Sequence, residues 1–313
     1  MAWSKLNGSG TSVNNYVDKV ILIVGPTGVG KTELAIRLAE RINGEIISAD
    51  SRYLYRGMNV GTAKPNSNDR NRVPHHLIDV ANPDETWSLA NFIDRTLLLI
   101  EEIHKRQRSV VIVGGSGQYF RALIEGWQIP ELEPNHLLRD CLGDWAEDIS
   151  GIGLHHKLAI IDPQAAEKID PTNIRRTIRG LEVIFSTGRR FSELRKRVEP
   201  MYRYHVIGLT MPREKLYARI DQRVEEMIDY GLVKEVQTLL DHGYSATLPS
   251  MSAIGYHEIF RFLMGEITID QAKELMRRRT RNLVRRQANW FKPSDTDINW
   301  YDAEPYPIEK IIA

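Results

Sequence analysis

The feature of the sequence that most constrains its fold is a glycine-rich segment of eight residues. It reads Gly25-Pro26-Thr27-Gly28-Val29-Gly30-Lys31-Thr32 and fits the pattern G-x-x-x-x-G-K-[ST] at every fixed position. A β-branched apolar run at 20–24 precedes it, and apolar residues with helical spacing follow it at 33–42. Strand, glycine turn and helix in this order are typical of a phosphate-binding loop.

This segment predicts a diphosphate site with a divalent metal ion. Its glycines allow backbone N–H groups and the N-terminus of the following helix to point at an anion. The Lys31 ammonium adds a mobile positive charge, and the Thr32 hydroxyl is placed to bind Mg²⁺. We therefore expect residues 25–32 to hold a diphosphate, with Thr32 as the metal ligand.

The rest of the chain alternates short apolar strands with helices. Further strands are predicted at 45–49, 110–113 and 206–209, with helices between them. Such alternation predicts an α/β fold, here a P-loop core with an open, mainly parallel sheet flanked by helices. Thr210 is expected to cap the helix that follows the last of these strands.

The strands give way to prolines and short helical runs between about 127 and 200. We expect a helical insertion domain without strands at 128–199, a core made of 17–127 and 200–313, and a flexible leader at 1–16. The leader has no signal-peptide core, and the sequence has no apolar stretch of membrane-spanning length. The single cysteine, Cys141, excludes an internal disulfide and fits a reducing cytoplasm. We expect a cytoplasmic monomer with no obligate protein partner.

Two of the predicted strands are followed by residues of different chemical character. The run at 110–113 leads into Gly114-Gly115-Ser116-Gly117, whereas the run at 45–49 ends at Asp50. The strand that ends in Asp and helps to hold the metal in many ATPases is therefore not the one at 110–113. Because the carboxyl ends of the strands line the ligand crevice of an open α/β sheet, Asp50 is expected beside the phosphates. The alternative for Asp50 is a residue that caps a turn or a helix.

Several segments together resemble the tRNA dimethylallyltransferase family. They lie at 47–51, 55–65, 74–79, 113–119 and 285–290, in the order that the family has. The order is far more specific than any single segment. The resemblance implies transfer of a dimethylallyl group from dimethylallyl diphosphate to N6 of adenine 37 in tRNA, beside the anticodon, with release of diphosphate.

The resemblance also implies roles for three residues around the phosphates. Asp50 matches the group that takes a hydrogen bond or a proton from the amine, and we favour this role over metal binding. Ser116 stands where many members carry Thr and keeps the hydroxyl that helps to hold the diphosphate. Arg223 matches an arginine that faces the diphosphate, although a solvated side chain or a pair with Glu226 is the alternative.

Contacts with tRNA are implied for a larger set of residues. These are Asp50, Ser51, Arg52, Tyr53, Arg175, Arg176, Arg179, Gly255, Tyr256, Arg281, Arg285, Arg286 and Gln287. At Ser252 and His257 the chain departs from members that carry arginine. Arg277, Arg281 and Arg285 recur every fourth residue, and such a stripe can follow a phosphate backbone or simply be a solvated helix face.

Three other functions fit parts of this sequence. An enzyme that prenylates free AMP, ADP or ATP would share the catalytic segments but has less need of the two arginine-rich regions. A small-molecule P-loop kinase would consume ATP. A non-catalytic RNA-binding module would leave Lys31 and Thr32 without a role.

Overall fold

The computed structural model describes residues 20–129, 132, 134–194 and 196–312 of the chain. The leader expected at 1–16 lies outside the described residues. The chain divides into two compact units. One is Ala122–Pro200, and the other combines the segments before and after it. The insertion expected at 128–199 lies within the unit Ala122–Pro200.

The larger unit is built on a six-stranded sheet in the order β3-β2-β4-β1-β7-β8. Its strands are β1 (Val20–Val24), β2 (Gly44–Ser48), β3 (His75–His76), β4 (Ser109–Val113), β7 (Tyr204–Thr210) and β8 (Ile298–Asp302). Each pair of neighbours runs parallel. The α/β fold with an open parallel sheet, expected from the sequence, is thus confirmed.

Parallel pairing brings the carboxyl ends of the central strands to one edge. Val113 at the end of β4 is the partner of Ile23 in β1 and of Ser48 in β2. The loops that leave these three strands therefore start side by side. This is the edge at which open α/β sheets bind ligands.

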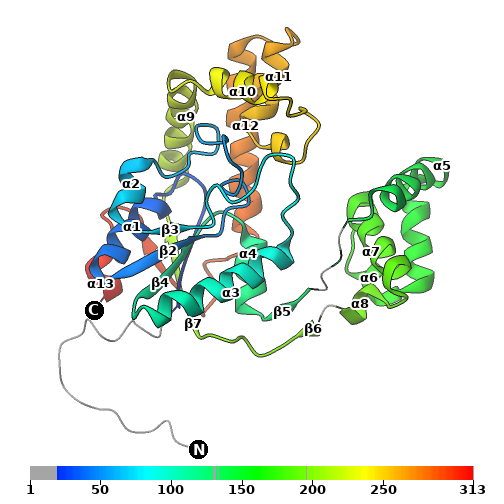
Figure 1. Cartoon of the computed structure of the whole chain (residues 1–313), viewed down its shortest axis with the longest axis horizontal. Helices are drawn as coiled ribbons and strands as arrows, with labels where there is room; N and C mark the ends of the chain where they lie inside the picture. The colour runs from blue at the N-terminus through cyan, green and yellow to red at the C-terminus, as the bar shows by residue number, and fades with distance from the viewer. Residues whose placement is uncertain (1–19, 130–131, 133, 195, 313) are drawn as a thin grey trace, which may run out of the picture. The chain divides into compact units, whose positions relative to one another are not determined.

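Apolar strands explain the position of the helices. Every residue of β1 is buried, and Ile21 and Ile23 pack with Leu34 and Leu38 of α1 (Lys31–Arg41). Each such buried side chain contributes about 1.5–3 kcal/mol. Helix α13 (Ile308–Ile312) adds Ile311 to the same core. Helix α3 (Leu89–Lys105) lies across the sheet from α1 (Figure 1).

A second core forms beyond the carboxyl edge of the sheet. It joins α9 (Arg213–Asp229), α10 (Leu232–Asp241), α11 (Tyr256–Leu263) and α12 (Ile269–Ala288) to the loop that follows β2. Tyr256 and Met276 lie at its centre with Val224 and Met58. Figure 1 shows these four helices gathered into one layer. The helix α2 (Ser67–Arg72) and the short helix η2 (Ser250–Ser252) complete the connections.

The smaller unit is mainly helical. Helices α5 (His136–Ile161), α6 (Pro163–Glu167), α7 (Ile174–Thr187) and α8 (Phe191–Leu194) enclose a core of Leu154, Leu158 and Leu181. The expectation that this region has no strand was wrong, because β5 (Trp127–Gln128) and β6 (Lys196–Arg197) form a two-residue antiparallel pair. Strands of two residues give no periodic signal. Helix α4 (Gly117–Ile124) leads into this unit. Over the described ranges of the chain, we find no helix that has both the length and the apolar character to cross a bilayer.

The segment after Lys292, which sequence patterns left unassigned, contains an edge strand. β8 pairs with β7, and Trp300 fits beside Gly208, where a Cβ atom would lie 2.5 Å from the indole. Thr210 ends β7 instead of capping α9, whose N-cap is Pro212.

The turn after β4 passes so close to Ala49 that we expect a side chain at Gly114 to lower the stability of the protein. A Cβ atom on Gly114 would lie 2.2 Å from the carbonyl carbon and oxygen of Ala49. Gly114→Ala is therefore expected to lower the free energy of unfolding by about 3 kcal/mol, because backbone must move. Thermal unfolding followed by circular dichroism checks this. Gly143→Ala, where a Cβ would meet no atom within 4 Å, is the control and is expected to change stability by less than about 1 kcal/mol. Equal melting of both variants would contradict this account of the turn.

Candidate functional site

The glycine-rich segment forms the turn between β1 and α1, as expected. Gly25 and Gly30 have φ angles of 144° and 102°, which side chains with a Cβ rarely adopt. A Cβ on Gly25 would also lie 2.7 Å from the Leu209 carbonyl oxygen. A tight glycine turn that leads into the start of a helix is an arrangement that binds phosphate.

Lys31 is the first residue of α1 and is held inside this turn. Its ammonium donates hydrogen bonds to the carbonyl oxygens of Gly25 (3.0 Å) and Pro26 (2.8 Å), and only 9% of the residue is exposed. Burial lowers the pKa of Lys31 to about 8, with Asp50 opposing and Arg223 adding to the shift. Both charges thus act on the lysine that is expected to hold the diphosphate.

Asp50 and Ser116 lie together at the ends of β2 and β4. The backbone N–H of Arg52 donates to Asp50 Oδ1 at 2.9 Å, and the N–H of Gly115 also donates to this carboxylate. The Ser116 hydroxyl accepts from the Ser51 N–H at 3.1 Å. Burial raises the pKa of Asp50, while these hydrogen bonds and Lys31 oppose the rise. The Asp50 carboxylate and the Ser116 hydroxyl are therefore positioned by the two turns that follow β2 and β4.

Arg223 faces the same site from α9. Its neighbours on the helix are engaged elsewhere, since Arg219 pairs with Glu304 and Gln222 donates to Glu226. Among the described residues, the Arg223 guanidinium has no hydrogen-bonding partner, so the alternative pair with Glu226 does not form. This leaves its positive charge available to an anion.

These groups share one cavity of about 280 Å³. Its wall includes Thr27, Lys31, Thr32, Asp50, Gly115 and Arg223. The described residues contain no cluster of three or more His, Cys, Asp or Glu that could hold a metal ion by itself. A Thr hydroxyl that faces a diphosphate cradle still suits Mg²⁺, which uses phosphate oxygens and water for most of its ligands.

The loop that carries Asp50 is braced by the segments at 55–65 and 74–79. Asp79 accepts from Lys64 Nζ and from Arg70 Nη1, both at 2.7 Å. Lys64 also donates to the Tyr55 carbonyl. The Tyr53 hydroxyl donates to the Ala63 carbonyl at 2.9 Å and is hydrogen-bonded to Thr32, so Tyr53 lies in the wall of the charged cavity.

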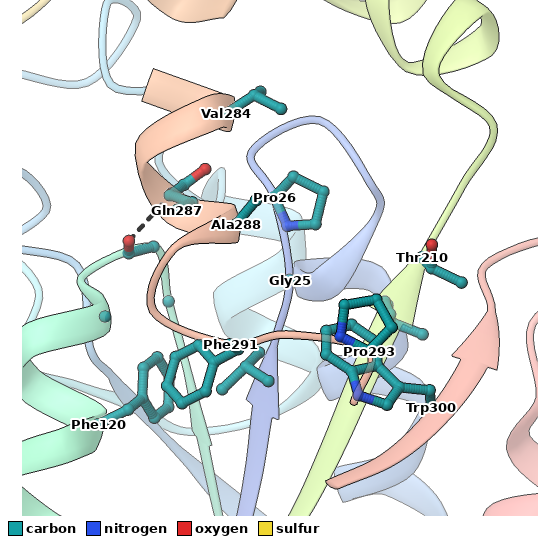
Figure 2. A pocket seen from close by; sticks show the side chains of 15 residues that line it. Gly25, Pro26, Phe120, Thr210, Val284, Gln287, Ala288, Phe291, Pro293 and Trp300 are labelled. Carbon is teal, nitrogen blue, oxygen red and sulfur yellow. Dashed lines mark hydrogen bonds between the residues drawn. The ribbon is translucent and has the colours of Figure 1, made fainter. Parts of the chain in front are cut away.

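A second cavity of about 150 Å³ is mainly apolar, and Figure 2 shows the side chains that line it. Phe120, Val284, Phe291 and Trp300 line it together with the backbone of Gly25 and Gly115. The two cavities share Gly114 and Gly115. The site can thus hold an uncharged group next to a diphosphate.

Gln287 lies between the P-loop and the turn Gly114-Gly115-Ser116-Gly117 that follows β4. It accepts from the Thr27 N–H at 2.8 Å and donates to the Gly115 carbonyl at 2.9 Å (Figure 2). This residue, expected to contact tRNA, thus bridges the P-loop and the turn that carries Ser116.

The remaining residues with an expected tRNA contact have different environments. Arg52 donates to the Pro249 carbonyl (2.9 Å) and to Ser252 Oγ (3.3 Å), so its guanidinium lies over η2. Tyr256 is fully buried and donates to Glu235, and Gly255, at φ 98°, starts α11 beside Leu232. The Tyr256 side chain belongs to the core, so only its backbone is placed for the expected contact with tRNA.

The three arginines of the expected stripe on α12 have different surroundings. Arg281 makes two hydrogen bonds of 2.8 and 2.7 Å to Asp221, and Arg277 pairs with Glu225, so both face α9. The exposed face of α12 instead carries Arg278, Arg285 and Arg286. In the smaller unit, Arg175 and Arg176 are exposed, whereas Arg179 is bound to Glu182 at 2.7 Å.

Two residues of the charged cavity were missed from the sequence. Ser48 and His75 both line it, and each has a buried side-chain polar atom that lacks a partner among the described residues. The available signals were weak. Ser48 precedes Asp50 by two residues in a strand, and His75 belongs to one of the family-like segments.

Comparison with known proteins identifies relatives over most of the chain. Residues 53–294 match the IPP transferase family. The chain is 49% identical over 273 residues to the tRNA dimethylallyltransferase of a Roseiflexus species, which covers 87% of this chain and 90% of the relative. It is 46% identical over 283 residues to the enzyme of that name from Thermomicrobium roseum, with 90% and 86% covered.

Solved structures agree with these sequence matches. A full-length tRNA isopentenylpyrophosphate transferase from Bacillus halodurans has a TM-score of 0.69 and 39% identity, with 94% of each chain covered. A eukaryotic dimethylallyltransferase acting on tRNA has a TM-score of 0.77 and 28% identity, with 91% of this chain and 74% of that chain covered. The P-loop, Asp50 and Ser116 of this protein therefore sit in a known fold, and the chain belongs to the IPP transferase family.

Proposed function

We propose that this protein transfers the dimethylallyl group of dimethylallyl diphosphate to N6 of adenine 37 in tRNA. The observation that carries the proposal is the single cavity in which Lys31 and Arg223 face Asp50. Two cations suit a diphosphate, and a carboxylate suits the proton of an amine that becomes acidic during the reaction. The names of the relatives given above favour this chemistry over other uses of a P-loop.

Binding of the donor follows from the cradle. The N–H groups of the P-loop, with Lys31 and Arg223, would hold the diphosphate, and Thr32 would hold Mg²⁺. When bound, Mg²⁺ neutralises charge on the phosphate oxygens. The Ser116 hydroxyl, fixed by the Ser51 N–H, would hold a diphosphate oxygen or the acceptor amine.

The bond changes then follow in one step. The N6 nitrogen forms a bond to C1 of the donor as the bond from C1 to the diphosphate oxygen breaks. Negative charge grows on the leaving group, where Lys31 and Arg223 stabilise it. The N6 proton passes to Asp50, whose two hydrogen-bonded N–H donors orient the carboxylate.

The acceptor is expected to reach the cavity from an anticodon loop. Its bases are already partly unpaired, so extrusion of one costs only a few kcal/mol. The exposed cations Arg175, Arg176, Arg285 and Arg286 would bind phosphates. One chain supplies every group named here, so we propose that the protein acts as a monomer. Because its proposed acceptor is tRNA, we propose that it acts in the cytoplasm.

The proposal is tested by incubation with labelled dimethylallyl diphosphate and, separately, tRNA, AMP or ATP. Label in tRNA alone is the expected result. Label in AMP or ATP would favour the adenylate enzyme, and transfer of the γ-phosphate of ATP would favour a kinase. Either outcome would overturn the proposed function.

Asp50→Asn is expected to lower turnover by between about 100-fold and 10,000-fold, because the amide cannot take the proton. Binding of donor and tRNA should change little, since the amide retains an oxygen for the Arg52 N–H group. Rapid-quench kinetics and equilibrium binding measure the two effects. A variant that keeps its turnover would remove the assigned role.

The pKa shifts predict a bell-shaped pH dependence of kcat/KM for the donor. Lys31, with a pKa of about 8, is charged below that pH, so donor binding should weaken by up to about tenfold per pH unit above it. On the acid side the rate falls as Asp50 becomes protonated, at a pH above the usual range because burial raises its pKa. The measurement is kcat/KM from pH 5 to about 10. A flat alkaline limb would contradict the role of Lys31.

Arg285→Ala with Arg286→Ala should weaken tRNA binding and reduce the slope of log K against log salt by about 1–2, since two phosphate contacts are lost. Arg281→Ala is the matched control. It should lower stability through loss of the bond to Asp221 and leave the slope unchanged. The reverse pattern would favour a phosphate contact of Arg281 over its bond to Asp221.

A further inference from the structure

Gln287 makes two hydrogen bonds that join the loops on either side of the proposed reaction centre. Its Oε1 accepts from the Thr27 N–H at 2.8 Å, and its Nε2 donates to the Gly115 carbonyl at 2.9 Å. An N–H can only donate and a carbonyl can only accept, so the orientation of the amide is fixed by its partners. The side chain is therefore a strut of defined length between the P-loop and the turn that follows β4.

The first end of this strut lies beside the backbone that holds Lys31. Thr27 directly follows Gly25 and Pro26, and both of their carbonyl oxygens accept from Lys31 Nζ. Because the ammonium group and its acceptors belong to one loop, a displacement of Thr27 would move them together. Gln287 thus helps to set the position of the whole cradle.

The second end of the strut lies beside Asp50. A Cβ atom on Gly115 would lie 2.8 Å from Gln287 Nε2 and 3.3 Å from Asp50 Oδ2, so the amide and the carboxylate pack against the same glycine. The next residue is Ser116, whose hydroxyl accepts from the Ser51 N–H. A shift of this turn would therefore move it relative to the carboxylate that is proposed to take the proton.

Helix α12, which carries Gln287, is anchored before and after this residue. Arg281, earlier on the helix, makes two hydrogen bonds to Asp221 of α9. Beyond the helix, the Trp290 carbonyl accepts from Arg121 of α4 at 2.8 Å. The amide of Gln287 therefore acts from a fixed backbone.

We propose that Gln287 is a positioning residue that fixes the distance between the diphosphate cradle and Asp50. This inference rests on the proposed function. The bond that forms and the bond that breaks share C1 of the donor, so the carboxylate and the cradle must be held at a matched separation. A misplacement of about 1 Å can lower the rate of such a step by about 100-fold.

Gln287→Met tests this role, because methionine is of similar length and lacks a strong donor or acceptor. The single-turnover rate with saturating dimethylallyl diphosphate and tRNA should fall between about 10-fold and 100-fold. The Kd values for inorganic diphosphate and for tRNA should stay within about threefold, since the cradle moves as one loop. Gln287→Asn keeps the amide but is one methylene shorter, and it should lower the rate in the same way.

Gln237→Met is the matched control, because this exposed glutamine of α10 is bonded only within its own helix, to Asp241. It should change neither the rate nor the two Kd values. Thermal unfolding of each variant shows whether it folds, and Gln287→Asn decides if Gln287→Met does not.

Three results would overturn the positioning role. They are an unchanged single-turnover rate in the folded Gln287 variant, a higher Kd for tRNA with no loss of rate at saturation, and a lower melting temperature with the same rate per folded molecule. A wild-type protein that does not label tRNA would instead overturn the proposed function.

Discussion

The site depends on charged groups that gather around one cavity and, among the described residues, form no direct ion pair with one another. Lys31 bonds to two carbonyl oxygens, Asp50 accepts from backbone N–H groups, and Arg223 faces the cavity without a partner among the described residues. Such an arrangement costs free energy in the unliganded protein, because buried charges are normally paired. An anion that enters between Lys31 and Arg223 relieves that cost. The cavity is therefore preorganised for a diphosphate, and the fold must be stable enough to hold it open.

The sheet supplies that stability. The fully buried β1 and β4 fix the starting points of the P-loop and of the glycine turn, and Gly114 lets this turn cross Ala49 at a distance that no side chain permits. The Asp79 bonds with Lys64 and Arg70 brace the loop on the other side of Asp50. Lys64 and Asp79 lie in the family-like segments, so these segments reflect support of the site as well as contact with substrates.

The sequence was enough to predict the parts of the site that depend on local pattern. The phosphate-binding turn follows from eight residues between a strand and a helix, and the meeting of Asp50 with Ser116 follows from the common edge of parallel strands. Contacts between segments that lie far apart in the sequence could not be predicted from it. Arg281 has helical spacing suited to a phosphate stripe, but Asp221 on α9 binds it. Trp300 gave no strand signal because its place depends on Gly208 in β7. Ser48 and His75 become visible only when β2 and β3 are placed in register.

The central claim is that the cationic cradle formed by Lys31 and Arg223 binds the diphosphate of the donor. It is tested most directly by calorimetric titration of the protein with dimethylallyl diphosphate at about pH 8.5, in buffers of different ionisation enthalpy. Lys31, whose pKa is about 8 in the free protein, is then largely neutral and must become charged as the diphosphate binds. The account predicts uptake of a proton on binding. Tight binding without proton uptake would contradict it.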